Sequence, residues 1–204
     1  EIRAVMIAPV GDGRRPGVLL YTDIFQLTES TLRTARRLAS SGFVVCVPEI
    51  YAHGELAGVA LEFDDAGKAA GQAAAAAMPV AQFDADRVAV LDHLGARADV
   101  DGLCAVGFCI GGHLAFRAAL DPRVAATVCF YPTGLSDGAL GAKADAGSLA
   151  AAGRIGGRLM IVFGSRDPHV PAAARLQVVG ALYEAGLTDL ELHVFAGGEH
   201  AFMR

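Results

Sequence analysis

Short apolar runs alternate with longer helix-like segments along most of this sequence. The apolar runs, rich in Val, Ile, Leu and Phe, cover residues 17–21, 43–47, 103–108, 125–130, 159–163 and 190–195. Helix-like spacing of apolar residues is found between them, at 31–40, 81–98, 113–120 and 172–185. Strands that are buried on both faces are continuously apolar, and helices are the usual connections between parallel strands. The pattern therefore predicts an α/β chain: a mostly parallel sheet with helices on both faces.

The chain is expected to form one domain over residues 1–204. Its length fits a single domain, and neither a repeat nor a linker interrupts the pattern. Residues 52–80 are rich in Ala and Gly and are interpreted as a loop followed by a helix, and residues 135–157 as an irregular excursion. The helix at 81–98 is expected to turn one apolar side to the core, formed by Phe83, Val88, Val90, Leu91 and Leu94.

The carboxyl ends of the strands are where such sheets bind ligands. The run at 103–108 leads directly into Cys109, within the residues 107–112 (GFCIGG). A sharp strand-to-helix turn around a nucleophile needs small residues two positions to either side, here Gly107 and Gly111. The following helix N-terminus favours a thiolate and an oxyanion. The alternative is a buried structural cysteine beside a Gly-rich turn.

Two further strand ends carry residues that suit a cysteine nucleophile. Asp167 follows the run at 159–163, and His200 follows the run at 190–195. Taken alone, Asp167 reads as a turn residue before Pro168, and His200 as a surface or structural histidine. Together with Cys109 they stand in the order nucleophile, Asp, His that is typical of an α/β-hydrolase. The other histidines lack this combined context: His53, His93, His113, His169 and His193.

Composition narrows the classes of partner. The formal net charge is −5, with 53% hydrophobic and 19% charged residues, so the chain is expected to be globular. Lys and Arg form no cluster, which argues against nucleic acid and an anionic membrane as partners, and no apolar run is long enough to span a bilayer. Spacing of the four cysteines fits neither a zinc site nor a disulfide framework, which favours a reduced, cytoplasmic protein: Cys46, Cys104, Cys109 and Cys129.

These motifs resemble those of the dienelactone hydrolase family, and the resemblance covers nearly the whole chain. It is carried by residues 107–112 (GFCIGG), 164–171 (GSRDPHVP), 198–202 (GEHAF) and 47–51 (VPEIY). The resemblance implies a three-layer α/β-hydrolase fold and a Cys–His–Asp triad. It also implies hydrolysis of an enol-lactone ester to a ring-opened dicarboxylic acid derivative, without a metal or an organic cofactor.

The resemblance also assigns roles around the first strand end. Family members commonly have Glu-Ile-Phe-Gly where this chain has Asp23, Ile24, Phe25 and Gln26. That Glu contacts the resting thiol and takes part in its activation, so the role passes to Asp23, whose side chain is one methylene shorter. The backbone N–H groups of Ile24 and Ile110 are the expected oxyanion donors.

Three more positions relate to substrate binding in the family. An Arg that grips the substrate carboxylate is replaced here by His53, which holds an anion only when protonated. Arg204 stands where a second carboxylate-binding Arg can occur, although a solvated charge is the alternative. Tyr131 corresponds to a substrate-side Tyr, with a half-buried structural aromatic as the alternative.

The function expected from the sequence is hydrolysis of a small activated ester or enol-lactone by Cys109, with His200 as base and Asp167 orienting it. A general small-acyl carboxylesterase or thioesterase is one alternative, favoured by the replacement at His53. The other is a non-catalytic protein of the same fold that senses redox state through its thiol. The expected partner is a small molecule, and the chain is expected to be a monomer or a small homo-oligomer.

Overall fold

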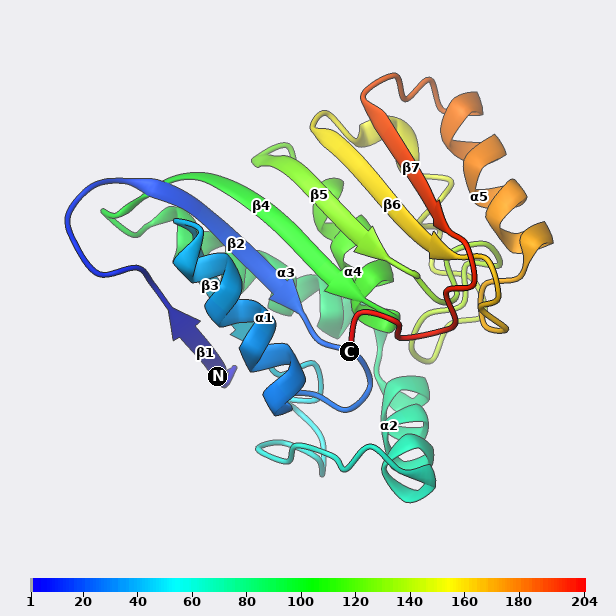
Figure 1. The fold of residues 1–204 in the computed structure, drawn as a ribbon, viewed down its shortest axis with the longest axis horizontal. Helices are drawn as coiled ribbons and strands as arrows, with labels where there is room; N and C mark the ends of the chain where they lie inside the picture. The colour runs from blue at the N-terminus through cyan, green and yellow to red at the C-terminus, as the bar shows by residue number, and fades with distance from the viewer. Residues whose placement is uncertain (1) are drawn as a thin grey trace.

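A seven-stranded sheet forms the centre of the molecule (Figure 1). The computed structural model describes residues 2–204. The strands lie in the order β1-β3-β2-β4-β5-β6-β7, and all neighbours are parallel except β1 and β3. Their bounds are β1 Ala4–Ile7, β2 Arg15–Tyr21, β3 Val44–Pro48, β4 Val100–Phe108, β5 Val124–Phe130, β6 Arg158–Gly164 and β7 Leu190–Phe195. The helices are α1 Glu29–Ser40, α2 Asp65–Ala77, α3 Val80–Gly95, α4 Ile110–Ala119 and α5 Ala172–Glu184, with a 3₁₀ turn η1 at Ala152–Arg154.

The predicted parallel α/β sheet is confirmed, and each of the six predicted strands is present with ends shifted by up to three residues. Strand β1 was not predicted; it has four residues, all of them only half-buried. It pairs antiparallel with β3 through Val5 opposite Val47. A short strand at the sheet edge needs no continuous apolar run, which is why periodicity did not reveal it.

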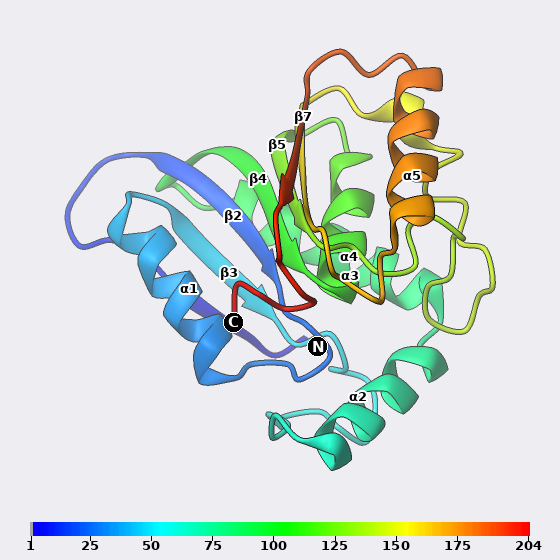
Figure 2. The same ribbon diagram turned by 45° about the vertical axis from the view of Figure 1, so that its right-hand side comes forward.

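Helices cover the two faces of the sheet unequally (Figure 2). Helix α1 packs through Ala35 and Ala39 on one face, together with Val18, Leu20 and Val45 of the strands. Helices α3, α4 and α5 pack on the opposite face. There they form a second cluster with the strand side chains that point to that face. Alternating side chains of one strand thus serve two cores, which gives the three layers.

The predicted apolar side of α3 is right except at one position. Phe83, Val90, Leu91 and Leu94 are buried against the sheet, whereas Val88 is 40% exposed. Val88 lies two residues before Val90, and residues two apart point to different sides of a helix. The prediction of Val88 in the core was therefore wrong.

Residues 52–80 contain the predicted loop followed by a helix, α2. Figure 1 shows α2 beyond the arrowheads of β2 and β4, at the carboxyl ends of the strands. The Tyr51 hydroxyl donates a hydrogen bond of 2.8 Å to the carbonyl of Gly71 in the middle of α2. Tyr51 is only 1% exposed, so α2 is tied to the core although most of its residues face away from the sheet.

Candidate active site

Cys109 occupies a strained turn between β4 and α4. It is the N-cap residue of α4, with φ 60° and ψ −123°. Residues other than glycine rarely adopt this backbone conformation. Added Cβ atoms at Gly107 and Gly111 would overlap the carbonyls of Gly111 and Thr22. The tight turn predicted from the glycine spacing is therefore present, and it presents the Cys109 side chain at the end of the central strand.

His200 and Asp167 form a hydrogen-bonded pair beside this turn. His200 Nδ1 and Asp167 Oδ2 lie 2.8 Å apart, and the Asp167 side chain is fully buried. The backbone N–H groups of His169 and Val170 donate to Asp167 Oδ1 at 2.8 and 3.3 Å, which fixes the carboxylate. Because a carboxylate only accepts hydrogen bonds, Nδ1 of His200 carries the proton and Nε2 has the free lone pair.

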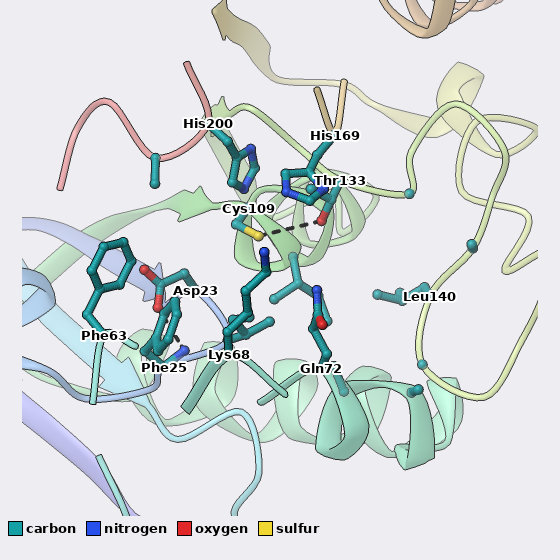
Figure 3. A pocket seen from close by; sticks show the side chains of 18 residues that line it. Asp23, Phe25, Phe63, Lys68, Gln72, Cys109, Thr133, Leu140, His169 and His200 are labelled. Carbon is teal, nitrogen blue, oxygen red and sulfur yellow. Dashed lines mark hydrogen bonds between the residues drawn. The ribbon is translucent and has the colours of Figure 1, made fainter. Parts of the chain in front are cut away.

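Cys109 and His200 both line one cavity of about 450 Å³ (Figure 3). Cys109, Ile110 and His200 line one side of it, and Lys68 and Gln72 of α2 lie across from them. The remaining wall is formed mostly by apolar or small residues, among them Ile24, Phe25, Phe63, Ala75, Ala76, Leu140 and Gly141. The size suits a small molecule rather than a polymer chain.

The Cys109 thiol is hydrogen-bonded to Thr133 rather than to His200. Its Sγ lies 3.7 Å from Thr133 Oγ1, and no hydrogen bond joins it to His200 in residues 2–204. Burial raises the pKa of the thiol to about 11, while hydrogen bonds from Thr133 and from the backbone of Ile110 act in the opposite direction. The resting group is thus a neutral thiol at neutral pH.

Both residues expected to supply oxyanion donors line the cavity. Ile110 is the first residue of α4, where the amide N–H groups are free of helical partners. Ile24 lies in the turn after β2, and within the described residues its N–H makes no hydrogen bond. The free N–H of Ile24, and the N–H of Ile110 that bonds to the resting Cys109 thiol, suit a developing negative charge.

Asp23 is paired with Arg204 and makes no hydrogen bond to Cys109 in the described chain. Its other oxygen accepts the N–H of Phe25 at 2.9 Å. The Arg204 guanidinium also stacks on Phe25 and Phe63, at 4.7 and 4.3 Å from the ring centroids. The charges of Asp23 and Arg204 therefore neutralise each other. Arg204 is not among the residues that line the cavity.

The other two residues expected to bind substrate also lie outside the cavity lining. His53 is hydrogen-bonded to Asp86 at 2.9 Å on the surface. Tyr131 is 2% exposed and packs its ring edge-on against His200, with centroids 5.0 Å apart. Tyr131 thus supports the back of the histidine ring instead of facing the cavity.

Gln26, where the family commonly has Gly, adopts a positive φ of 65°. Its side-chain amide donates to the carbonyls of Leu56 and Val59 at 2.7 and 2.9 Å, and its oxygen accepts from the N–H of Tyr51. Gln26 is fully buried, so three hydrogen bonds offset the strain of the backbone. This side chain joins the turn after β2 to the loop that leads to α2.

Four polar residues of the cavity were not predicted from the sequence: Lys68, Gln72, Thr133 and His169. The Ala- and Gly-rich pattern of α2 did not reveal which face meets the sheet, so Lys68 carried no signal. Thr133 follows the strand β5, and attention to all strand ends would have included it. Burial, followed by the nearby His200, lowers the pKa of His169, and this ring lies edge-on to His200 at 4.7 Å.

Two other kinds of site were sought in residues 2–204. No group of three or more His, Cys, Asp or Glu side chains is arranged to hold a metal ion there. Within the same residues, no helix has both the length and the apolar character that a bilayer crossing requires.

Comparison with known proteins places the chain in a family. The model of the dienelactone hydrolase family matches residues 2–204. A candidate carboxymethylenebutenolidase of Saccharomyces cerevisiae is 34% identical over 203 residues, which are 97% of this chain and 74% of that protein.

Solved structures agree with this match. The crystal structure of a candidate dienelactone hydrolase from Klebsiella pneumoniae superposes with a TM-score of 0.78 at 26% identity, covering 98% of this chain and 82% of that one. A dienelactone hydrolase-like promiscuous phosphotriesterase from metagenomic libraries gives a TM-score of 0.72 at 25% identity, over 98% and 84% of the two chains. The chain therefore belongs to the dienelactone hydrolase family and is an α/β-hydrolase acting on carboxylic ester bonds, the bond class that includes lactones.

Proposed function

We propose that this protein opens small activated esters or enol-lactones through a Cys109–His200–Asp167 triad. The observation that carries the proposal is the placement of Cys109 in a strained turn, in the same cavity as a histidine already paired with a buried aspartate. Strain of this kind persists only where the surrounding structure imposes it, and it is concentrated at functional sites.

The protons can be followed through one cycle. The thiol proton passes to His200 Nε2, the sulfur attacks the carbonyl carbon, and the oxyanion accepts hydrogen bonds from the N–H groups of Ile24 and Ile110. His200 then returns the proton to the leaving oxygen as the C–O bond breaks. Water, deprotonated by His200, attacks the thioester, and the sulfur leaves and regains a proton. Asp167 stabilises the imidazolium in both halves.

The buried thiol favours this proposal over a redox sensor. Burial raises the pKa of Cys109 to about 11, so the thiolate is scarce at neutral pH until a base removes the proton. A sensing cysteine is oxidised as an exposed thiolate, whereas Cys109 is half-buried. The four cysteines are free, which supports the proposed cytoplasmic setting.

Lys68 supports a substrate that carries a carboxylate. It is the only Lys or Arg among the described residues that line the cavity, and no ion pair of the described chain uses it. Figure 3 shows its side chain extending from α2 in the direction of Cys109. Since His53 and Arg204 are bound to Asp86 and Asp23, Lys68 takes the place that the resemblance gave to an arginine.

A general small-acyl carboxylesterase or thioesterase is the second candidate. It is favoured by the largely apolar cavity wall and by the engagement of Arg204 outside the cavity. A panel of esters and lactones, matched except for a free carboxylate, separates the two. A higher kcat/KM for the substrates with a carboxylate supports lactone hydrolysis. Equal kcat/KM for charged and neutral substrates supports a general esterase.

The test of the proposed function is Cys109→Ala, assayed with p-nitrophenyl acetate and with dienelactone. Loss of the nucleophile is expected to lower kcat by at least about a thousandfold, because the remaining residues supply only binding and oxyanion stabilisation. Cys104→Ala is the control, since Cys104 lies on β4, the strand that leads into Cys109, but outside the cavity lining. Hydrolysis that survives in Cys109→Ala would refute the triad.

A further inference from the structure

The loop after β5 provides the hydrogen-bond partner of the reacting sulfur. Thr133 Oγ1 lies 3.7 Å from Cys109 Sγ, and Figure 3 marks this interaction across the cavity wall. Within the described residues, the hydroxyl of Thr133 has no other hydrogen-bond partner. Its proton is therefore free to point at the sulfur, and toward a thiolate the hydroxyl can only donate.

The backbone holds Thr133 against the turn of Cys109. The N–H of Thr133 donates to the carbonyl of Cys109 at 3.2 Å, and the N–H of Tyr131 donates to Val162 at 2.7 Å. Gly134 follows with a φ of 70°, and a Cβ there would overlap the carbonyl of Ala139. The backbone that carries the Thr133 hydroxyl is thus held beside the turn of Cys109.

A buried histidine fixes the other side of the same residue. His113 of α4 is fully buried, and its Nδ1 lies 3.2 Å from the carbonyl of Thr133. Burial lowers the pKa of His113 to about 4, so the ring is neutral at neutral pH. A carbonyl only accepts, so Nδ1 of His113 carries the proton and donates it to Thr133.

The remaining contacts of this histidine admit one arrangement of hydrogens. With Nδ1 protonated, Nε2 must accept, and it receives the hydroxyl of Ser148 at 2.7 Å. Ser148 Oγ in turn accepts from Arg117 at 2.9 Å, and Arg117 donates to Asp84 at 3.0 Å. The donor and the acceptor of each hydrogen bond between Asp84 and the Thr133 carbonyl are therefore known. All side chains of this network are buried or half-buried.

We propose that Thr133 is a further catalytic residue, whose hydroxyl donates a hydrogen bond to the Cys109 sulfur whenever the sulfur is anionic, and that His113 is the residue that positions it. This inference rests on the proposed role of Cys109 as nucleophile. The sulfur carries negative charge when its proton leaves for His200 and again when the thioester breaks. A hydrogen bond to a charged acceptor is stronger than one to a neutral thiol, so the Thr133 contact stabilises both steps.

Several other ionisable groups surround this sulfur. Asp23 comes from the end of β2, Lys68 from α2, His169 and Asp167 from the loop after β6, and His200 from the turn after β7. All of them are unchanged in variants at Thr133. A difference between such variants and the parent therefore reports the hydroxyl and not the surrounding charges.

The experiment measures the alkylation rate of Cys109 by iodoacetamide against pH, read from the Cys109 peptide by mass spectrometry, in Thr133→Val and Thr133→Ser. Loss of one charge-assisted hydrogen bond is expected to move the midpoint for Val upward by about one pH unit, and to lower kcat for p-nitrophenyl acetate about tenfold at pH 7. Thr133→Ser keeps the hydroxyl, so its alkylation midpoint and its kcat are both expected to stay near the parental values. His113→Asn, which retains a donor to Thr133 but not the acceptor for Ser148, is expected to move the midpoint in the same direction by less.

Thr127→Val is the matched control, because Thr127 is a buried threonine of β5 whose hydroxyl has no partner among the described residues. It is expected to leave the midpoint and kcat unchanged. Thr133→Ala replaces Thr133→Val if the latter does not fold. An unchanged midpoint and kcat in a folded Thr133→Val or Thr133→Ala would overturn the inference. Failure of the triad shows up separately, as activity that survives Cys109→Ala, since the alkylation readout needs no turnover.

Discussion

At the scale of single residues, polar contacts decide which groups remain available to a substrate. Asp23 and Arg204 neutralise each other, and His53 is held by Asp86 on the surface. Lys68 has no such partner in the described chain and faces the cavity. The charge offered to a ligand is therefore set by the pairing of side chains and not by a count of acids and bases.

Lys68→Met is expected to lower kcat/KM for a carboxylate-bearing lactone about tenfold, since an exposed charge-assisted contact contributes about 1.4 kcal/mol. Neutral p-nitrophenyl acetate is expected to be hydrolysed at the parental rate. Steady-state kinetics with both substrates checks this. Lys143→Met, at an exposed lysine outside the cavity lining, is the control. An equal loss for both substrates would assign Lys68 a structural role instead.

His113 makes stability depend on pH. Its pKa is lowered to about 4 by burial, whereas an unfolded chain protonates histidine near its ordinary value of about 6.5. Between these values the unfolded state binds the extra proton, so stability is lost as pH falls. Urea unfolding is expected to give a free energy lower by about 2 kcal/mol at pH 5 than at pH 7 from this residue. Most of that difference should vanish in a folded His113→Asn; an unchanged difference would contradict the assignment.

At the scale of elements, α2 is the piece whose position shapes the cavity. Its middle is fastened by Tyr51 to Gly71, and Gly71 lies against the turn that carries Ile24. A Cβ at Gly71 would lie 2.5 Å from the carbonyl oxygen of Ile24. The packing of Gly71 against this turn therefore positions both Lys68 on α2 and the expected oxyanion donor Ile24.

Gly71→Ala is expected to displace α2 or the Ile24 turn, with a loss of about 1–3 kcal/mol in stability and a lower kcat. Gly180→Ala in α5 is the matched control, because nothing lies within 4 Å of the added Cβ. That change is expected to stabilise the protein by about 0.5–1 kcal/mol, as alanine favours a helix. Thermal unfolding and esterase kinetics of both variants check the contrast, and similar behaviour of the two would refute the close packing of α2.

At the scale of the whole molecule, the site brings together residues from near the start and the end of the described chain. Asp23 and Arg204 are 181 positions apart in sequence, yet they form a half-buried ion pair between the end of β2 and the turn after β7. Their side chains are 14% and 16% exposed. The residues of the proposed triad follow β4, β6 and the edge strand β7, and this ion pair fastens the last turn to the end of β2.

Asp23→Asn and Arg204→Met are each expected to destabilise the protein by about 1–3 kcal/mol, because each leaves the partner charge without its pair. The double variant is expected to lose less than the sum of the two, with a coupling of about 1–2 kcal/mol. Urea unfolding of the four proteins measures the cycle. Additive losses would mean that the pair contributes nothing as a pair.

Much of the fold and part of the site could be predicted because they depend on local patterns. Continuous apolar runs mark buried parallel strands, and the glycines around Cys109 mark a turn that excludes side chains. The order Cys109, Asp167, His200 follows from the order of the strands. Strand β1 was not predicted because a short edge strand carries no continuous apolar run, and Val88 was misjudged because, two residues before Val90, it points to another side of α3.

Local sequence patterns specify the parallel sheet, the sharp turn at Cys109 and the strand ends where Asp167 and His200 lie. Which polar groups meet depends on the folded chain: Asp23 pairs with Arg204, the thiol faces Thr133, and Lys68 enters the cavity from α2. The physical reason is that hydrogen bonds and ion pairs form between groups within about 4 Å, wherever they stand in the sequence. Local periodicity specifies elements, whereas partners are set by the packing of elements against one another.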